Sequence, residues 1–127
     1  MRVIISGGRK AVRERVKQMV TGGGEIAVIG FAGCDSMLAE TRRLIPDAVI
    51  MLADGKESSR DVMEATHLIV EARLATRVLI MTDNIVRDLT SAIKAGAAGL
   101  LSLSVDRNEL MTALMVPDYQ RNIRANS

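Results

Sequence analysis

The chain has very little aromatic character: Phe31 and Tyr119 are its only aromatic residues, and tryptophan is absent. Proteins that hold single-stranded nucleic acid stack the bases on aromatic side chains, and such a platform is missing here. Seventeen lysines and arginines are spread among fifteen acidic residues without a dense basic block, so the formal net charge is only +2. We therefore do not expect this chain to bind nucleic acid by itself.

Cysteine and histidine are equally scarce, with one of each. A single cysteine, Cys34, excludes an internal disulfide, which is typical of proteins from a reducing cytoplasm, where we expect this one. His67 has no second histidine or cysteine at ligand spacing, so we interpret it as a surface or packed residue and expect no metal site. With one histidine there is no basis for a Ser/His/Asp or Cys/His catalytic set, and we expect neither enzymatic activity nor a cofactor.

Long apolar stretches are missing as well. No run approaches the ~18 residues that a membrane-spanning helix needs, so we expect no membrane partner. With 127 residues, 48% of them apolar, the chain has the size of one ordinary domain. We expect this domain to cover residues 1–116, followed by a linker or tail over 117–127, because PDYQRNIRANS is polar and has no periodicity.

Short apolar runs do alternate with longer amphipathic ones. The runs lie at residues 3–5, 26–29, 48–52, 78–81 and 99–101, and they are apolar on both faces, as strands of a covered parallel sheet are. The helix after the fourth run is predicted to begin at an N-cap Asp83 and to bury Val86, and the last helix to begin at an N-cap Asp106. Five such repeats predict an α/β three-layer sandwich. Its five-stranded parallel sheet has the flavodoxin-like order 2-1-3-4-5, with a site at the carboxyl ends of strands 1 and 3.

Several segments carry a resemblance to a known family. RVII at the start, RRLIPDAVIM before and in the third strand, EAT in the third helix, RVLIMT, KAGAAGLL and the final NEL together resemble the CheY-like receiver domain of bacterial response regulators. The similarity is greatest to the NarL/LuxR type and extends over residues 2–116. It implies a signalling module of a two-component system, which dimerises through helices 1 and 5 or through helix 4, strand 5 and helix 5. DNA would be contacted only through a helix-turn-helix domain after Ser127.

The chemistry implied by this resemblance needs several polar groups at the carboxyl edge of the sheet. These are an acidic pair after strand 1 for Mg²⁺, an aspartate ending strand 3, a threonine or serine ending strand 4 and a lysine ending strand 5. Here the acidic pair falls on Gly7 and Gly8, which offer Mg²⁺ no carboxylate oxygens. The lysine position falls on Leu103, so its cation is lost, and only Thr82 matches.

The phosphoacceptor position has two candidates. Counting forward from Pro46 places it at Leu52, and counting back from Glu64 places it at Asp54, because the chain has two extra residues between these anchors. Side chains alternate along a strand, so both candidates point to the same face and lie roughly 6 to 7 Å apart. The plainer interpretation of Asp54 is a strand-ending Asp-Gly turn with Lys56 as its partner.

From these losses we predict an atypical receiver, a pseudo-receiver, that is independent of phosphorylation. It would act as a homodimer or on a protein partner, as part of a transcription regulator. Two alternatives stay open. One is a sensor of an anion or metabolite in the former phosphorylation cleft, with the anion held by Gly8, Arg9 and Lys10 at a helix N-terminus. The other is a weak phosphoacceptor through Asp54.

Overall fold

The computed structural model describes residues 1–54 and 59–116, so the predicted tail over 117–127 and Lys56 lie outside the described residues. In this part, strands alternate with helices along the chain. The strands are β1 (Arg2–Gly7), β2 (Ala27–Ala32), β3 (Ala48–Ala53), β4 (Arg77–Thr82) and β5 (Gly99–Ser102). The helices are α1 (Lys10–Thr21), the short 3₁₀ helix η1 (Cys34–Ser36), α2 (Met37–Leu44), α3 (Ser59–Glu71), α4 (Ile85–Ala95) and α5 (Arg107–Met115).

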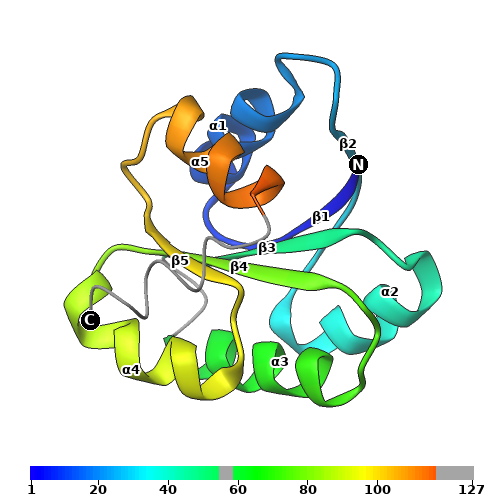
Figure 1. Ribbon diagram of the computed structural model, residues 1–127, viewed down its shortest axis with the longest axis vertical. Helices are drawn as coiled ribbons and strands as arrows, with labels where there is room; N and C mark the ends of the chain where they lie inside the picture. Colours follow the sequence, from blue (N-terminus) through cyan, green and yellow to red (C-terminus); the bar gives the residue numbers. More distant parts are fainter. Residues whose placement is uncertain (55–58, 117–127) are drawn as a thin grey trace.

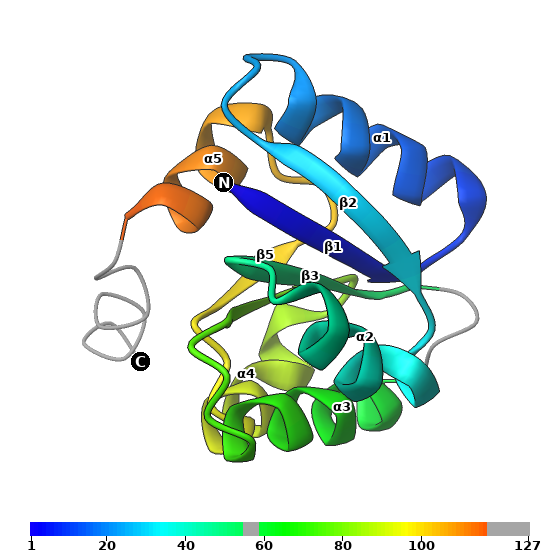
Figure 2. The ribbon, with the colours of Figure 1, turned by 90° about the vertical axis from the view of Figure 1, so that its right-hand side faces the viewer.

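The five strands form one parallel sheet in the order β2-β1-β3-β4-β5, as predicted. Helices α1 and α5 cover one face of the sheet, and α2, α3 and α4 cover the other (Figures 1 and 2). Because the chain winds in opposite directions from β1 and from β3, a crevice is expected outside the carboxyl ends of these two strands.

Side chains along each strand alternate between two apolar cores, one under each helical layer. Leu52 and Leu101 belong to the core under α1 and α5, whereas Met51 and Leu100 belong to the core under α2, α3 and α4. Every residue of β3 is buried, because β3 has neighbouring strands on both edges and helices on both faces. No helix in the two described ranges is both long and apolar enough to cross a membrane.

The prediction that α4 buries Val86 is wrong. Val86 is 91% exposed, while Asp88 and Ala92 are buried toward the sheet. The physical reason is that the Asp88 carboxylate accepts a hydrogen bond from the buried hydroxyl of Thr82. This contact turns a charged residue inward and leaves the valine in solvent.

The helix N-caps follow local hydrogen bonding. Asp106 caps α5 as predicted, since its side chain accepts a hydrogen bond from the backbone N–H of Glu109 at 2.9 Å. The cap of α4 is Asn84, whose Oδ1 accepts from the backbone N–H of Arg87 at 2.9 Å. The prediction of Asp83 was therefore wrong by one residue, because an asparagine is an equally good cap and stands directly before the helix.

Candidate functional site

Several of the residues predicted for the site lie at or directly after the carboxyl ends of the strands. Gly7 ends β1 and is paired with Leu52 of β3. Thr82 ends β4 and is paired with Ala53. Leu103 directly follows β5, and its backbone N–H donates to the carbonyl oxygen of Thr82 at 2.9 Å. The topology thus brings together side chains that are up to about a hundred residues apart in the sequence.

The two candidates for the phosphoacceptor position have different surroundings. Leu52 lies inside β3, is fully buried and belongs to the core under α1 and α5. Asp54 follows the last residue of β3, is 8% exposed and reaches Arg9, which directly precedes α1. Both side chains therefore lie on the α1 side of the sheet, as their spacing of two residues predicts. The carboxylate lies one pleat beyond the leucine.

The glycines after β1 leave room for this leucine. Gly8 has φ +79°, a left-handed conformation that favours glycine. A β-carbon added to Gly8 would lie 2.8 Å from Cδ1 of Leu52. The leucine side chain thus fills the space that a side chain at Gly8 would need.

Asp54 forms a two-pronged ion pair with Arg9. Nε of Arg9 donates to Oδ2 at 3.0 Å, Nη2 donates to Oδ1 at 3.1 Å, and the backbone N–H of Arg9 makes a longer contact with Oδ2 at 3.4 Å. Parallel donation from a guanidinium to both carboxylate oxygens is a strong and directional arrangement. The guanidinium contact lowers the pKa of Asp54 and raises the pKa of Arg9.

Arg9 is one of the two cations predicted to hold an anion at the start of α1. Its side chain is 68% exposed, while the Asp54 side chain that it contacts is 9% exposed. The second cation, Lys10, is the exposed first residue of α1. An internal carboxylate thus occupies the arginine that an external anion would use.

Thr82, the residue that matches the family pattern, takes part in a separate network. Its hydroxyl donates to Oδ2 of Asp88 at 2.6 Å and accepts from the backbone N–H of Asn84 at 3.1 Å. Ser59, at the start of α3, also donates to Oδ2 of Asp88, at 3.1 Å. One carboxylate on α4 therefore links the end of β4 to the first residue of α3.

Arg87 completes the network from the solvent side. Its Nε donates to Oδ1 of Asp88 and its Nη2 to Oδ2, both at 3.0 Å, and Nη2 also reaches Oγ of Ser59 at 2.8 Å and Oδ1 of Asp83 at 3.1 Å. Hydrogen bonds from Arg87, and then from Thr82 and Ser59, lower the pKa of Asp88. Asp88 is 3% exposed, so these donors replace the water that a carboxylate would otherwise need.

Asp88, Arg87 and Ser59 were not among the residues predicted for the site. A signal was present, because Asp88 lies four residues before Ala92 and seven before Ala95, on the same helical face as these small residues. An acidic residue on such a face indicates that the sheet supplies a hydrogen-bond donor for its carboxylate, or that the helix turns a different face toward the sheet than its apolar residues predict.

Leu103, where the resemblance implies a lysine, packs against the core under α1 and α5 and contributes no charge. Gly7 and Gly8 contribute no side-chain oxygens, and the described residues contain no group of three or more His, Cys, Asp or Glu side chains that could hold a metal ion. Mg²⁺ requires near-octahedral oxygen coordination with carboxylate ligands. The residues present therefore do not fit the Mg²⁺ that the resemblance implies.

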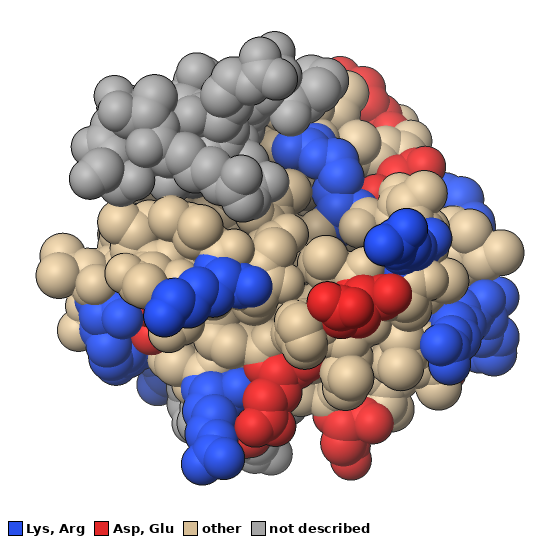
Figure 3. Space-filling view, turned by 60° about the horizontal axis from the view of Figure 1, so that its bottom comes forward, with Lys and Arg blue, Asp and Glu red and all other residues tan. Residues whose placement is uncertain are grey.

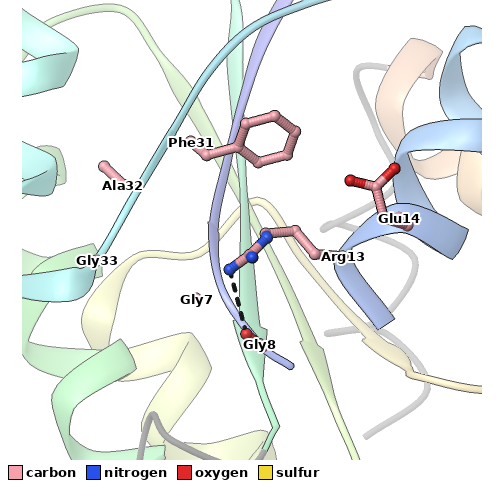
Figure 4. A pocket seen from close by; sticks show the side chains of 7 residues that line it. All are labelled: Gly7, Gly8, Arg13, Glu14, Phe31, Ala32 and Gly33. Carbon is pink, nitrogen blue, oxygen red and sulfur yellow. Dashed lines mark hydrogen bonds between the residues drawn. The ribbon is translucent and has the colours of Figure 1, made fainter. Parts of the chain in front are cut away.

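A hollow of about 380 Å³ adjoins the two glycines. It is lined by Gly7, Gly8, Arg13, Glu14, Phe31, Ala32 and Gly33 (Figure 4). Figure 4 shows the Arg13 side chain crossing this hollow, and its Nη1 donates to the carbonyl oxygen of Gly8 at 3.4 Å. The hollow extends the site from β1 toward the edge strand β2.

The face formed by α2, α3 and α4 carries charges of both signs. Figure 3 shows lysine and arginine side chains interspersed with aspartate and glutamate, separated by uncharged surface. Among the described residues, Figure 3 shows no continuous basic area on this face of the kind that a polyanion such as nucleic acid would need.

The sequence matches no protein-family model and no curated protein. Solved structures do match. The signal receiver domain of NarL from Mycobacterium tuberculosis is 22% identical with a TM-score of 0.79, over 90% of this chain and 92% of that one. A LuxR-family two-component response regulator from Aurantimonas sp. SI85-9A1 is 26% identical with a TM-score of 0.77, over 98% of this chain and 96% of that one.

A third structure extends the comparison beyond the NarL and LuxR proteins. The response regulator domain of CheB from Thermotoga maritima is 20% identical with a TM-score of 0.71, over 98% of this chain and 94% of that one. The resemblance to response regulator receiver domains is thereby confirmed, and so is the predicted fold.

Proposed function

We propose that this chain is a receiver-like regulatory module that transmits signals without phosphorylation, by associating with a second copy or with a partner protein. The observation that carries the proposal is the ion pair of Arg9 with Asp54. Both oxygens of this carboxylate accept a hydrogen bond from one guanidinium, so the negative charge and one lone pair of each oxygen are already engaged.

The surroundings of Asp54 support the same conclusion. Phosphoryl transfer is catalysed almost entirely by positioning and by neutralising charge. Gly7 and Gly8 provide no carboxylate ligands for a divalent cation, and Leu103 provides no ammonium group for a phosphoryl oxygen. The hydroxyl of Thr82 donates to Asp88 at 2.6 Å. To contact a phosphoryl group on Asp54 instead, this hydroxyl would have to break a short, buried hydrogen bond.

We further propose that the module belongs to a transcription regulator. Similar structures include a DNA-binding response regulator of the LuxR family from Staphylococcus aureus. The present domain carries a formal net charge of only +2, so contact with DNA would come from a separate output domain.

The test is light scattering coupled to gel filtration over a range of protein concentrations, with and without Mg²⁺ and acetyl phosphate. We expect self-association that is indifferent to both additions, and an unchanged mass for the protein. A phosphorylation-competent receiver treated in parallel verifies that the phosphodonor is active. An Asp54→Asn variant should behave in the same way as the wild-type protein.

A Mg²⁺-dependent mass increase that is absent in Asp54→Asn would overturn the phosphorylation-independent mechanism and establish Asp54 as a phosphoacceptor. Association that appears only with Mg²⁺ and acetyl phosphate would overturn it as well. If the protein stays monomeric under all conditions, self-association is excluded as the output.

The hollow beside Gly7 and Gly8 favours a second candidate, a sensor of small anionic metabolites. Its volume is within the range of small-molecule sites, and the Arg13 guanidinium supplies a donor for an anionic group. Ligands that bind the folded state raise the thermal midpoint in proportion to the logarithm of their concentration. A concentration-dependent increase with phosphate or a nucleotide that is lost in Arg13→Gln would support this function, and an unchanged midpoint at millimolar ligand would oppose it.

A further inference from the structure

A partly exposed phenylalanine lies on the edge strand β2. Phe31 is 44% exposed, and its ring centroid lies 5.8 Å from Cζ of Arg13 and 5.7 Å from Nζ of Lys17, both on α1. Aromatic and arginine side chains are enriched in protein interfaces, where they act as anchors. We call Phe31, Arg13 and Lys17 the basic face.

A groove of opposite charge lies on the other side of β2. It has a volume of about 500 Å³ and is lined by Cys34, Asp35, Asp61, Glu64, Ala65 and Leu68, from η1 and α3. Ala65 is buried and Leu68 is 52% exposed, so the groove combines apolar surface with three exposed acidic residues. We call these six residues the acidic groove.

The basic face and the acidic groove are neighbours in the fold. Gly33 lines the hollow beside Arg13, and the next residue, Cys34, lines the acidic groove. Figure 2 shows the arrangement: α1 lies on one side of the sheet edge, α2 and α3 lie on the other, and β2 runs between them. A rotation of 180° about an axis along this edge would place each basic face on the acidic groove of a second copy.

We propose that two copies of this chain associate in this way, with Phe31 of each copy inserted between the apolar side chains of the other copy's acidic groove. This inference rests on the proposed function and names the surface through which it operates. The surface differs from the two dimer faces implied by the family resemblance, because β2 and η1 contribute to it. Arg13 and Lys17 then face Asp35 and Glu64 of the partner.

Two further charges lie at these surfaces. Glu14 lines the hollow beside Arg13, and Arg60 forms an ion pair with Glu64 at 3.3 Å. The side chains of Arg60 and Glu64 are 87% and 64% exposed, and pairs this exposed contribute little to stability. Glu64 is thus available to a partner cation at small cost.

The test uses two charge-reversed proteins. One carries Arg13→Glu with Lys17→Glu, and the other carries Asp35→Lys with Glu64→Lys. Each protein alone would place like charges against each other at both contacts, so each should be monomeric where the wild type is dimeric. An equimolar mixture restores opposite charges at both contacts and should form a 1:1 heterodimer, detected by light scattering or native mass spectrometry.

The same experiment separates this surface from others. Lys94→Glu, an exposed charge change on α4 away from both surfaces, should leave the wild-type dimer intact. Circular dichroism verifies that every variant is folded. A milder variant, Phe31→Ser, should weaken the dimer about tenfold or more without charge reversal, as removal of an interface anchor does.

Failure of this inference and failure of the proposed function give different results. If the wild type dimerises but both charge-reversed proteins remain dimeric, or if Phe31→Ser has no effect, the dimer uses another surface and the inference is overturned while the function stands. Monomeric variants that do not combine in the mixture would also overturn it. A wild type that never self-associates would exclude both the inference and self-association as the output.

Discussion

Asp54 and Asp88 are two buried carboxylates at the same edge of the sheet, but they are held in different ways. Asp54 is paired with a single arginine, Arg9, whose side chain is 68% exposed. Asp88 accepts hydrogen bonds from side chains on three elements, Thr82 of β4, Ser59 of α3 and Arg87 of α4. The first carboxylate depends on one contact that solvent can reach, whereas the second links three elements together.

The difference divides the carboxyl edge of the sheet into two halves. In the half at β1 and β3, Leu52 fills the space beside Gly8, and the carboxylate of Asp54 lies one pleat further out, paired with Arg9. In the half at β4, the hydroxyl of Thr82 donates a hydrogen bond to the carboxylate of Asp88. The first half is therefore maintained by apolar packing and the second by hydrogen bonds. Four measurements test this difference between the two halves.

Leu52→Ala should have the largest effect, because Leu52 is fully buried in the core under α1 and α5. Removing a buried leucine side chain costs lost apolar burial and leaves a cavity, together about 3 to 4 kcal/mol. Urea unfolding monitored by circular dichroism measures this change. A loss below about 1 kcal/mol would mean that apolar packing does not maintain this half of the site.

Asp88→Ala should be next, with a loss of about 2 to 3 kcal/mol, because the hydroxyl of Thr82 is left buried without its acceptor. Asp88→Asn is the matched control, since it keeps the shape and one acceptor oxygen, and it should lose less. Asp54→Ala should cost less than Asp88→Ala, because Arg9 regains water. Equal losses at the two aspartates would contradict the comparison.

Gly8→Ala should cost about 1 to 2 kcal/mol, since alanine is strained at φ +79° and its β-carbon would meet Leu52. The contact is relieved in a Leu52→Ala background, while the backbone strain remains. A double-mutant cycle by urea unfolding should therefore give a smaller cost for Gly8→Ala in that background. Additive costs would show that the leucine does not occupy the space beside Gly8.

The smallest effect concerns pH. Arg9 lowers the pKa of Asp54, so the stability from this pair is fully present above the carboxyl pKa of the unfolded chain, about 4, and is lost as pH falls through the lower folded pKa. Arg9→Gln should remove this part of the acid dependence. The pKa of Asp88 is lowered in the wild type and in Arg9→Gln alike, so its contribution to the acid dependence is the same in both. The change in thermal midpoint between pH 7 and pH 3 is measured for each protein, and the difference between the two changes reports the Arg9–Asp54 pair. Parallel curves would show that Arg9 does not perturb Asp54.

The alternation of apolar runs and amphipathic segments was enough to predict the order of elements and the sheet. Burial on both faces of β3 follows from the run without polar residues at 48–53. Leu52 and Asp54 lie on the same face because they are two residues apart and side chains alternate along a strand. Errors occurred where a polar side chain could satisfy its hydrogen bonds in more than one way. Asp83 and Asn84 are both good caps, and only the backbone geometry selects Asn84.

From the sequence alone, the fold and the residue types at the ends of the strands could be read, because these depend on local periodicity and on the identity of single residues. Which polar groups pair with one another depends on the three-dimensional arrangement of the strands and helices. Arg9 reaches Asp54 across 45 positions of the chain, and Ser59 reaches Asp88 across 29. Such contacts form only when the strands are ordered side by side, since hydrogen bonds depend on distances of about 3 Å that no local pattern specifies.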